Sequence, residues 1–414
     1  MTGRSDLPAA PASRFVLPKR SANVLPQDQR ERALDFVRAL IEPPTAPYFE
    51  DAQVEVVRRF VADRPGFTLA EDEHTNLVVT WKPRAKAKKG QRALAFSAHL
   101  DHPGFHYIGV KQGVHRATFH GGVPPRYFPG TAVRFFDVKT RRACATARVR
   151  SIARDAGQNL VAELEGVRGR PKRGAFGVFD LASGVVRGTR IHARVCDDLF
   201  GAAAILATLD TLQREDHPHT VVGIFTRAEE TGFVGCIGLL ESKAISKDLA
   251  VIGLECSPRR ATAKVGLGPV IRVGDRVSVF DPELTQELQD AASRLREKNP
   301  EFRFQRALMD GGSCESTAYN AWGIRAGAMC LALGNYHNCG ADGSIQPEFV
   351  DWNDFEGLVA LMLESSRGFA DEPLAGKARV RLKRTYEHEY KRLATSASRM
   401  KSASARPGKR ERVR

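Results

Sequence analysis

The stretch "TVVGIFTRAEETGFVG", residues 220–235, contains the pattern that decides the fold. Its first seven residues are mostly β-branched or aromatic, and such a run predicts a buried strand. Two adjacent glutamates, Glu229 and Glu230, follow the run and precede a turn at Thr231 and Gly232. Neighbouring carboxylates repel each other, and burying either one is unfavourable unless it is paired or bound to a metal ion. Taken alone, this stretch fits a solvated loop with two surface acids.

The composition is that of an ordinary globular protein. Of the 414 residues, 42% are hydrophobic and 27% are charged, and the length predicts two or three domains. No apolar run approaches the ~18 residues that cross a bilayer, and charges interrupt the N-terminus where a signal peptide needs an apolar segment. The 7 cysteines form no C-x-x-C motif, which favours free thiols in a reducing compartment. We therefore expect a cytoplasmic protein without a membrane contact.

The formal net charge of +15 is concentrated in a basic C-terminal tail. Residues 377–414 contain 14 Lys and Arg against 3 Glu, a net +11 that leaves only +4 for the rest of the chain. Tails of this composition bind polyanions without sequence preference. The tail therefore indicates a non-specific polyanion contact. A non-catalytic scaffold that binds nucleic acid through this tail is one alternative for the whole protein.

Hydrophobic periodicity divides the remaining chain into three kinds of segment. Residues 1–27 are rich in Pro, Ala and Ser and are expected to be disordered. Residues 28–104 and 191–372 alternate between helix and strand patterns, which predicts an α/β catalytic domain with a mostly parallel sheet flanked by helices. Between them, residues 105–190 show short strand-like runs separated by turns, and these predict an inserted small all-β domain.

Acids and histidines recur at one kind of position, the C-terminal end of a predicted apolar strand. Open α/β sheets place ligands and catalytic groups at this edge. Each residue alone has a simpler explanation, such as a hydrogen-bonded core histidine or a carboxylate that caps a helix. One shared site explains all of the strand ends more economically than separate explanations do. The positions are His99, Asp197, the pair Glu229 and Glu230, Glu255 and His337.

These residue types suit hydrolysis assisted by two divalent metal ions about 3.5–4 Å apart. Imidazole and carboxylate ligands favour Zn²⁺, with Co²⁺ or Mn²⁺ as alternatives. Two cations so close together need a bridging carboxylate and, on each ion, one histidine and one further carboxylate. We therefore predict a centre of two divalent ions with five ligands: His99, Asp197, Glu230, Glu255 and His337.

Three carboxylates receive specific roles in this hypothesis. Asp197 bridges the two ions. Glu229 is left without a metal and takes a proton from the attacking water. Asp101 follows His99 by two residues on the same strand face, where it can orient the imidazole. One glutamate of the pair thus holds metal while its neighbour moves protons.

The order of these motifs resembles that of the tetrahedral (glutamyl, deblocking) aminopeptidases, a family of dinuclear metallopeptidases. The motifs are "HLDHPGF", "DDLFG", "EETGFVG", "LECS", "GLGPVIRVGD", "GGS" and "NYHN", and the likeness runs from about residue 29 to residue 369. The resemblance implies a zinc-peptidase-like fold, the same five metal ligands, and Glu229 as general base. It also implies that the inserted β-domain mediates dimerisation and shapes entry to the site, and hence a homo-oligomer.

Several positions around the ligands depart from the family pattern. Glu255 stands where the family has an aspartate, and His102 stands where it has an acid. Cys314 replaces the aspartate that follows two glycines, and "DDLFG" lacks the usual arginine. The ligand set is retained while its surroundings differ, so the pattern supports hydrolysis rather than one particular substrate.

We expect a metallo-aminopeptidase that removes N-terminal residues from short peptides. A deacylase or amidase acting on N-acylated amino acids would use the same metal site, and it is the alternative that keeps this chemistry. The scaffold alternative is disfavoured because a decayed enzyme would be expected to lose some of its ligands.

Overall fold

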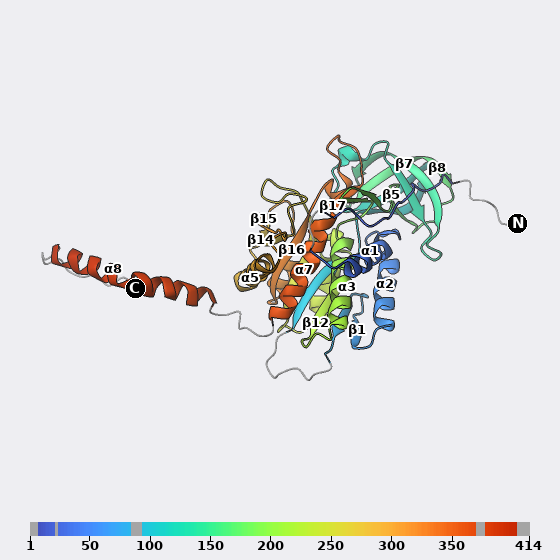
Figure 1. The fold of residues 1–414 in the computed structure, drawn as a ribbon. Helices are drawn as coiled ribbons and strands as arrows, with labels where there is room; N and C mark the ends of the chain where they lie inside the picture. Colours follow the sequence, from blue (N-terminus) through green and yellow to red (C-terminus); the bar gives the residue numbers. More distant parts are fainter. Residues whose placement is uncertain (1–6, 21–23, 84–92, 370–376, 404–414) are drawn as a thin grey trace. The chain divides into compact units, whose positions relative to one another are not determined.

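The computed structural model describes four stretches of the chain (Figure 1): residues 7–20, 24–83, 93–369 and 377–403. By their contacts the residues divide into two units, Met1–Ala370 and Asp371–Arg414. Among the described helices, none combines the length and the apolar character that a membrane span requires.

The opening stretch contributes the third strand along an eight-stranded sheet in the first unit. The strands are β1 (Phe67–Glu71), β2 (Leu77–Trp81), β3 (Leu94–His99), β12 (Val221–Thr226), β13 (Ala250–Pro258), β14 (Val270–Asp275), β15 (Gln305–Met309) and β16 (Arg325–Leu333). Their order is β1-β2-β12-β3-β13-β16-β14-β15, and β12, β3, β13 and β16 run parallel at the centre. Antiparallel pairings of β2 with β1 and β12, and of β14 with β16, make the sheet mixed. All six residues of β12 are buried because both of its faces are covered.

Helices cover both faces of this sheet (Figure 1). They are α1 (Gln27–Ile41), α2 (Asp51–Ala62), α3 (Leu199–Arg214), α4 (Val234–Glu241), α5 (Pro282–Lys298), α6 (Glu315–Ala321) and α7 (Trp352–Phe369). On one face, α3 packs on β3, β12 and β13, while α5 and α7 pack on β16; α1 lies outside α3. On the other face, α4 and α6 share a buried cluster with Val222, Ile224 and Val251. The α/β class predicted from the sequence is confirmed.

Between β3 and the small sheet described next, the chain forms a closed barrel, the teal and green element of Figure 1. Its strands are β4 (Gly104–Lys111), β5 (Val114–His120), β6 (Ala132–Phe136), β7 (Ala143–Arg154), β8 (Leu160–Gly169) and β9 (Phe176–Phe179), with a short helix η1 (Pro125–Tyr127). Five phenylalanines fill the interior: Phe105, Phe119, Phe128, Phe135 and Phe179. The barrel shares one contact unit with the sheet, so the domain boundary at residue 190 stays a prediction.

A three-stranded sheet, β10 (Val185–Arg187), β11 (Arg190–Ala193) and β17 (Glu348–Asp351), lies beside these elements. The sequence pattern places residues 191–198 in the main sheet, but β11 pairs with β10 and β17 instead and ends at Ala193. Asp197 therefore follows a strand of a different sheet and sits directly before α3. A local apolar pattern predicts a strand but not its partners, because the pairing depends on long-range contacts.

The N-terminal segment differs from the expectation that residues 1–27 are disordered. In residues 7–20, Arg14 pairs with Val185 at the edge of β10, and its amide nitrogen lies 2.9 Å from the carbonyl oxygen of Gly184. The amide of Lys19 bonds to the carbonyl of Gly188 at 3.0 Å. Main-chain pairing to an edge strand needs no apolar side-chain pattern, so composition alone gives no sign of it.

The second unit contains helix α8 (Lys377–Ala403), which has 27 residues. Leu382, Tyr386, Tyr390 and Leu393 recur at intervals of three or four residues and are each at least half exposed. Exposed arginines and lysines, among them Lys383 and Arg384, lie between them in the sequence. Residues 404–414 of the predicted tail lie outside the described part of the chain.

Candidate metal centre

His99, Glu229 and Glu255 meet because β3 and β12 end level with Glu255, which lies within the parallel strand β13. Pairing sets Thr226 opposite His99 and Gly253 opposite Ser97, so Glu255 lies level with His99. His99 Nε2 is 3.9 Å from an oxygen of Glu229 and 3.9 Å from an oxygen of Glu255. Glu229 begins the short helix η2 (Glu229–Thr231), directly beyond β12.

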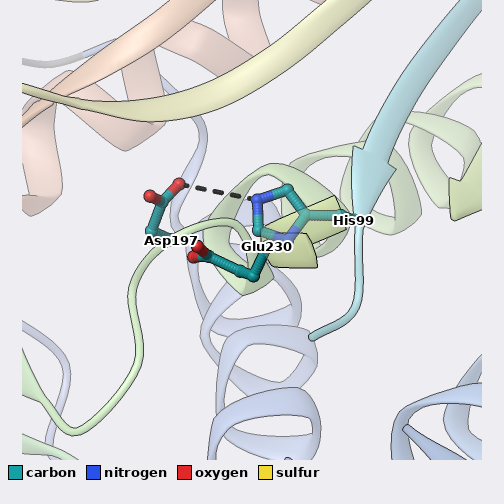
Figure 2. A group of neighbouring side chains, drawn as sticks. All are labelled: His99, Asp197 and Glu230. Atoms are coloured by element: carbon teal, nitrogen blue, oxygen red, sulfur yellow. Dashed lines mark ion pairs between the residues drawn. The ribbon is translucent and has the colours of Figure 1, made fainter. Parts of the chain in front are cut away.

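Asp197 stands between two histidines. Its Oδ1 is 3.8 Å from Nε2 of His99, and its Oδ2 is 3.6 Å from Nε2 of His337, in the short helix η3 (Tyr336–Asn338). The same nitrogen of His337 is 3.1 Å from Oε1 of Glu230. Figure 2 shows His99, Asp197 and Glu230 converging, with the ion pair between His99 and Asp197 dashed. One carboxylate oxygen thus faces each imidazole, as a bridging ligand requires.

Main-chain carbonyls set the orientation of both imidazoles. Nδ1 of His99 lies 3.2 Å from the carbonyl oxygen of Asp101, and Nδ1 of His337 lies 3.1 Å from that of Gly122. A carbonyl oxygen only accepts, so each Nδ1 carries the donated proton and each Nε2 points at the carboxylates. Gly122 belongs to the barrel, in the turn after β5, so the barrel helps to orient His337.

Asp101 holds the two glutamates by their backbone. Its Oδ1 accepts the N–H of Glu229 at 2.9 Å, and its Oδ2 accepts the N–H of Glu230 at 3.1 Å. Oδ1 also lies 3.5 Å from Nδ1 of His99. This fully buried carboxylate therefore fixes η2 against the end of β3.

The electrostatics of the cluster favour cations. Burial raises the pKa of Glu229 and Glu255 well above the usual range, and neighbouring carboxylates add to the effect. Burial alone would lower the pKa of His99 and of His337, but the carboxylates around them raise both well above the usual value. Without added positive charge, these carboxyl groups therefore tend to keep their protons. Divalent ions would displace those protons on binding.

Unsatisfied oxygen atoms in the described residues also fit a metal centre. Glu230 Oε1 makes no hydrogen bond, although His337 Nε2 is 3.1 Å away, and both oxygens of buried Asp198 lack a hydrogen-bond partner. Ligand atoms of His99, Asp197 and Glu230 lie within 4.8 Å of one another, as do those of His99, Glu229 and Glu255. This set of oxygen and imidazole donors suits divalent transition metals.

The thiols near the cluster are buried, and the Sγ of Cys256 lies within 4.8 Å of carboxylate oxygens of Asp197 and Asp198. Cys256 Sγ donates to the carbonyl oxygen of Cys196 at 3.4 Å, and burial raises the pKa of Cys256 well above the usual value. Burial also raises the pKa of Cys314 to about 11. Cys314, which replaces the aspartate of the family pattern, donates its main-chain N–H to Asp275 at 3.0 Å.

The structure brings all seven predicted site residues into one cluster: His99, Asp101, Asp197, Glu229, Glu230, Glu255 and His337. Their individual roles stay predictions. Sequence reasoning missed Gly122 and Glu348, which contact His337 through hydrogen bonds that involve main-chain atoms. No signal in the sequence marks them, because a glycine in a turn and a glutamate in a short strand are usually solvent-exposed.

Comparisons with known proteins find similarity to aminopeptidases. Residues 162–342 match the family model described as M42 glutamyl aminopeptidase. A protein of Acetivibrio thermocellus named "Putative aminopeptidase" is 24% identical over 187 residues, which are 44% of this chain and 52% of that protein. The match therefore spans about half the length of this curated relative.

Solved structures share the fold across most of the chain. A TET aminopeptidase from a marine sediment archaeon of the Thaumarchaeota has 16% identity and a TM-score of 0.68, covering 84% of this chain and 99% of that one. The TET1 peptidase of Pyrococcus horikoshii has 19% identity and a TM-score of 0.62, covering 81% of this chain and 99% of that one. The resemblance to tetrahedral aminopeptidases predicted from the sequence is confirmed by the family match and this fold.

We predict that each chain binds two divalent ions and that Glu230→Gln and Glu255→Gln each lose one of them. The two glutamates face different histidines, so neutralising one weakens one ion more than the other. Metal analysis after dialysis measures the ions per chain. Glu287→Gln, a buried carboxylate on α5 bonded to Arg294, is the control. Two ions retained in both site variants would contradict the ligand assignment.

Proposed function

We propose that this protein is a dinuclear metallo-aminopeptidase that removes N-terminal residues from short peptides. The observation that carries the proposal is Asp197, which faces His99 with one oxygen and His337 with the other. The M42 family match supports peptide-bond hydrolysis. We propose Zn²⁺ as the metal, with Co²⁺ or Mn²⁺ as alternatives, because the donors are nitrogen and oxygen.

Glu229 is the residue proposed to move protons. When bound, two divalent ions would polarise the scissile carbonyl and lower the pKa of an attacking water. The Glu229 side chain lies beside His99, while Asp101 holds its main-chain N–H. A carboxylate at this position can take a proton from the attacking water and pass it to the leaving amine.

Glu229→Gln should keep both metal ions and lower kcat by about 10²–10⁴, the usual worth of general acid–base catalysis. Gln preserves the size of the side chain but cannot accept the proton. Steady-state kinetics on an aminoacyl substrate, together with metal analysis, measure the two effects. If Glu229→Gln strips metal while Glu230→Gln does not, the two glutamates have exchanged roles.

The barrel is the proposed site of self-association. It presents partly exposed apolar side chains, including Ile108 at 38% and Val110 at 56% exposure. The Pyrococcus horikoshii relative can assemble into a tetrahedron or a large octahedral shell. We propose that this protein is likewise a homo-oligomer, in which assembly limits entry to short or unfolded peptides. Stable obligate interfaces commonly bury about 2,000 Å² or more in total.

We predict an oligomer that cleaves peptides with free N-termini and spares their N-acetylated forms. Light scattering measures the mass in solution, and paired assays on free and acetylated versions of one peptide measure the specificity. A monomer that cleaves only the acetylated peptide would contradict the aminopeptidase assignment and favour the deacylase.

Helix α8 suggests a separate contact with polyanions. Its exposed basic side chains, such as Arg381, Arg384, Lys391 and Arg392, can neutralise phosphates or sulfates. No proposed ligand or proton-transfer residue lies in this unit. We also propose a cytoplasmic location, which the free state of all seven cysteines supports: Cys144, Cys196, Cys236, Cys256, Cys314, Cys330 and Cys339.

Deleting residues 377–414 should leave kcat/KM on small peptides near the wild-type value, because the metal residues belong to the other unit. It should also abolish salt-sensitive retention on heparin, since that retention scales with the charges neutralised. Full-length protein at matched concentration is the reference for both measurements. A large loss of peptidase activity would show that the tail serves the catalytic unit.

A further inference from the structure

The peptide backbone around Asp197 is held on both sides by buried side chains that face no proposed metal position. Glu348 on β17 accepts the N–H of Cys196 at 2.7 Å and the N–H of Asp197 at 3.2 Å with its Oε2. His102 approaches from the other side, with Nδ1 3.0 Å from the carbonyl oxygen of Asp197. Glu348 is 0% exposed and His102 is 2% exposed.

The same carboxylate reaches a second ligand. Oε1 of Glu348 accepts the main-chain N–H of His337 at 2.8 Å. Glu348 therefore joins the segment before α3 to η3, two segments that are far apart in the chain. Both of its oxygens are engaged by N–H donors, so it is placed to orient ligands rather than to be one.

The hydrogen bonds of Asn338 define the role of His102. Nδ2 of Asn338 donates to the carbonyl oxygens of Arg194 at 2.9 Å and Gln346 at 3.1 Å, which fixes the direction of the amide. Oδ1 of Asn338 must then face His102, whose Nε2 lies 3.0 Å away. Both ring nitrogens of His102 thus lie within hydrogen-bond distance of an oxygen atom, and a carbonyl oxygen only accepts, so Nδ1 is the donor to Asp197.

We propose that Glu348 and His102 are positioning residues that hold Asp197 between the two histidines. Glu348 accepts a hydrogen bond from the N–H of Asp197, and His102 donates one to the C=O of Asp197. Both main-chain polar groups of Asp197 are therefore held. The bridging carboxylate is then aimed at His99 and His337 before any ion binds. This inference rests on the proposed metal centre, and it gives His102, a departure from the family pattern, a specific task.

Preorganisation of this kind governs metal affinity. Loss of a residue that orients a ligand typically costs about 10–100-fold in metal affinity. Gln at position 348 keeps the size of the side chain but replaces one acceptor oxygen with an NH₂ group that cannot accept the N–H it faces. Asn at position 102 can place its NH₂ near the former Nδ1 and keep the donor, whereas Asp, of the same shape, can only accept when ionised.

The test measures Zn²⁺ affinity of the full-length protein by competition with a chromophoric chelator, together with the unfolding temperature of the metal-free form. Glu348→Gln and His102→Asp should each bind Zn²⁺ about 10–100-fold more weakly, and His102→Asn should stay close to wild type. Asp354→Asn is the matched control, because Asp354 is also buried and accepts two main-chain N–H groups at 2.6 Å, those of Gly266 and Gly268.

Two results would overturn the proposal. One is a Glu348→Gln variant that loses thermal stability no more than Asp354→Asn and binds Zn²⁺ as tightly as wild type. The other is equal Zn²⁺ affinity in His102→Asn and His102→Asp, which would remove the donor role. A wild-type protein that binds no Zn²⁺ would instead overturn the metal centre itself and this inference with it, so the two failures are distinguishable.

Discussion

Repulsion among buried carboxylates is the constraint on which the rest of this structure depends. The ends of β3 and β12, the strands β13 and β17, the segment before α3 and the start of α6 bring acids together, most of them buried. They are Asp101, Asp197, Asp198, Glu229, Glu230, Glu255, Glu315 and Glu348. Burial raises the pKa even of Glu315, to about 6. Divalent ions relieve this repulsion, so metal binding and the stability of this edge of the sheet are linked.

The clustering of these residues at one edge of the sheet could be predicted from the sequence because its signals are local. His99, Glu230 and Glu255 each follow or end an apolar run, and parallel strands bring such ends together by geometry alone. Asp197 joins the cluster from a segment whose preceding strand pairs in another sheet, and the local sequence pattern does not reveal this. Glu348 could not be predicted, because its partners are N–H groups of residues that are far away in the chain.

Much of the support for the ligands comes from the main chain. Asp101 and Glu348 accept backbone N–H groups of four cluster residues, and carbonyl oxygens of Asp101 and Gly122 orient the imidazoles. Every residue type except proline offers the same backbone N–H and C=O groups, so these hydrogen bonds can survive extensive substitution. An arrangement held by main-chain groups therefore tolerates changes in the side chains around it.

The turn after β5 makes the barrel part of the chemistry. Gly121 has φ +122°, and a Cβ there would meet Pro103 at 2.5 Å; a Cβ on Gly122 would meet the His337 ring at 3.3 Å. The two adjacent glycines thus allow the barrel to approach the imidazole of His337 closely. Chimeras that exchange barrels between relatives must carry this glycine pair with the graft, and a minimal enzyme stripped of its barrel would need a substitute carbonyl for His337. The hydrogen bond between His337 and the carbonyl oxygen of Gly122 therefore limits how freely the barrel can be exchanged or removed.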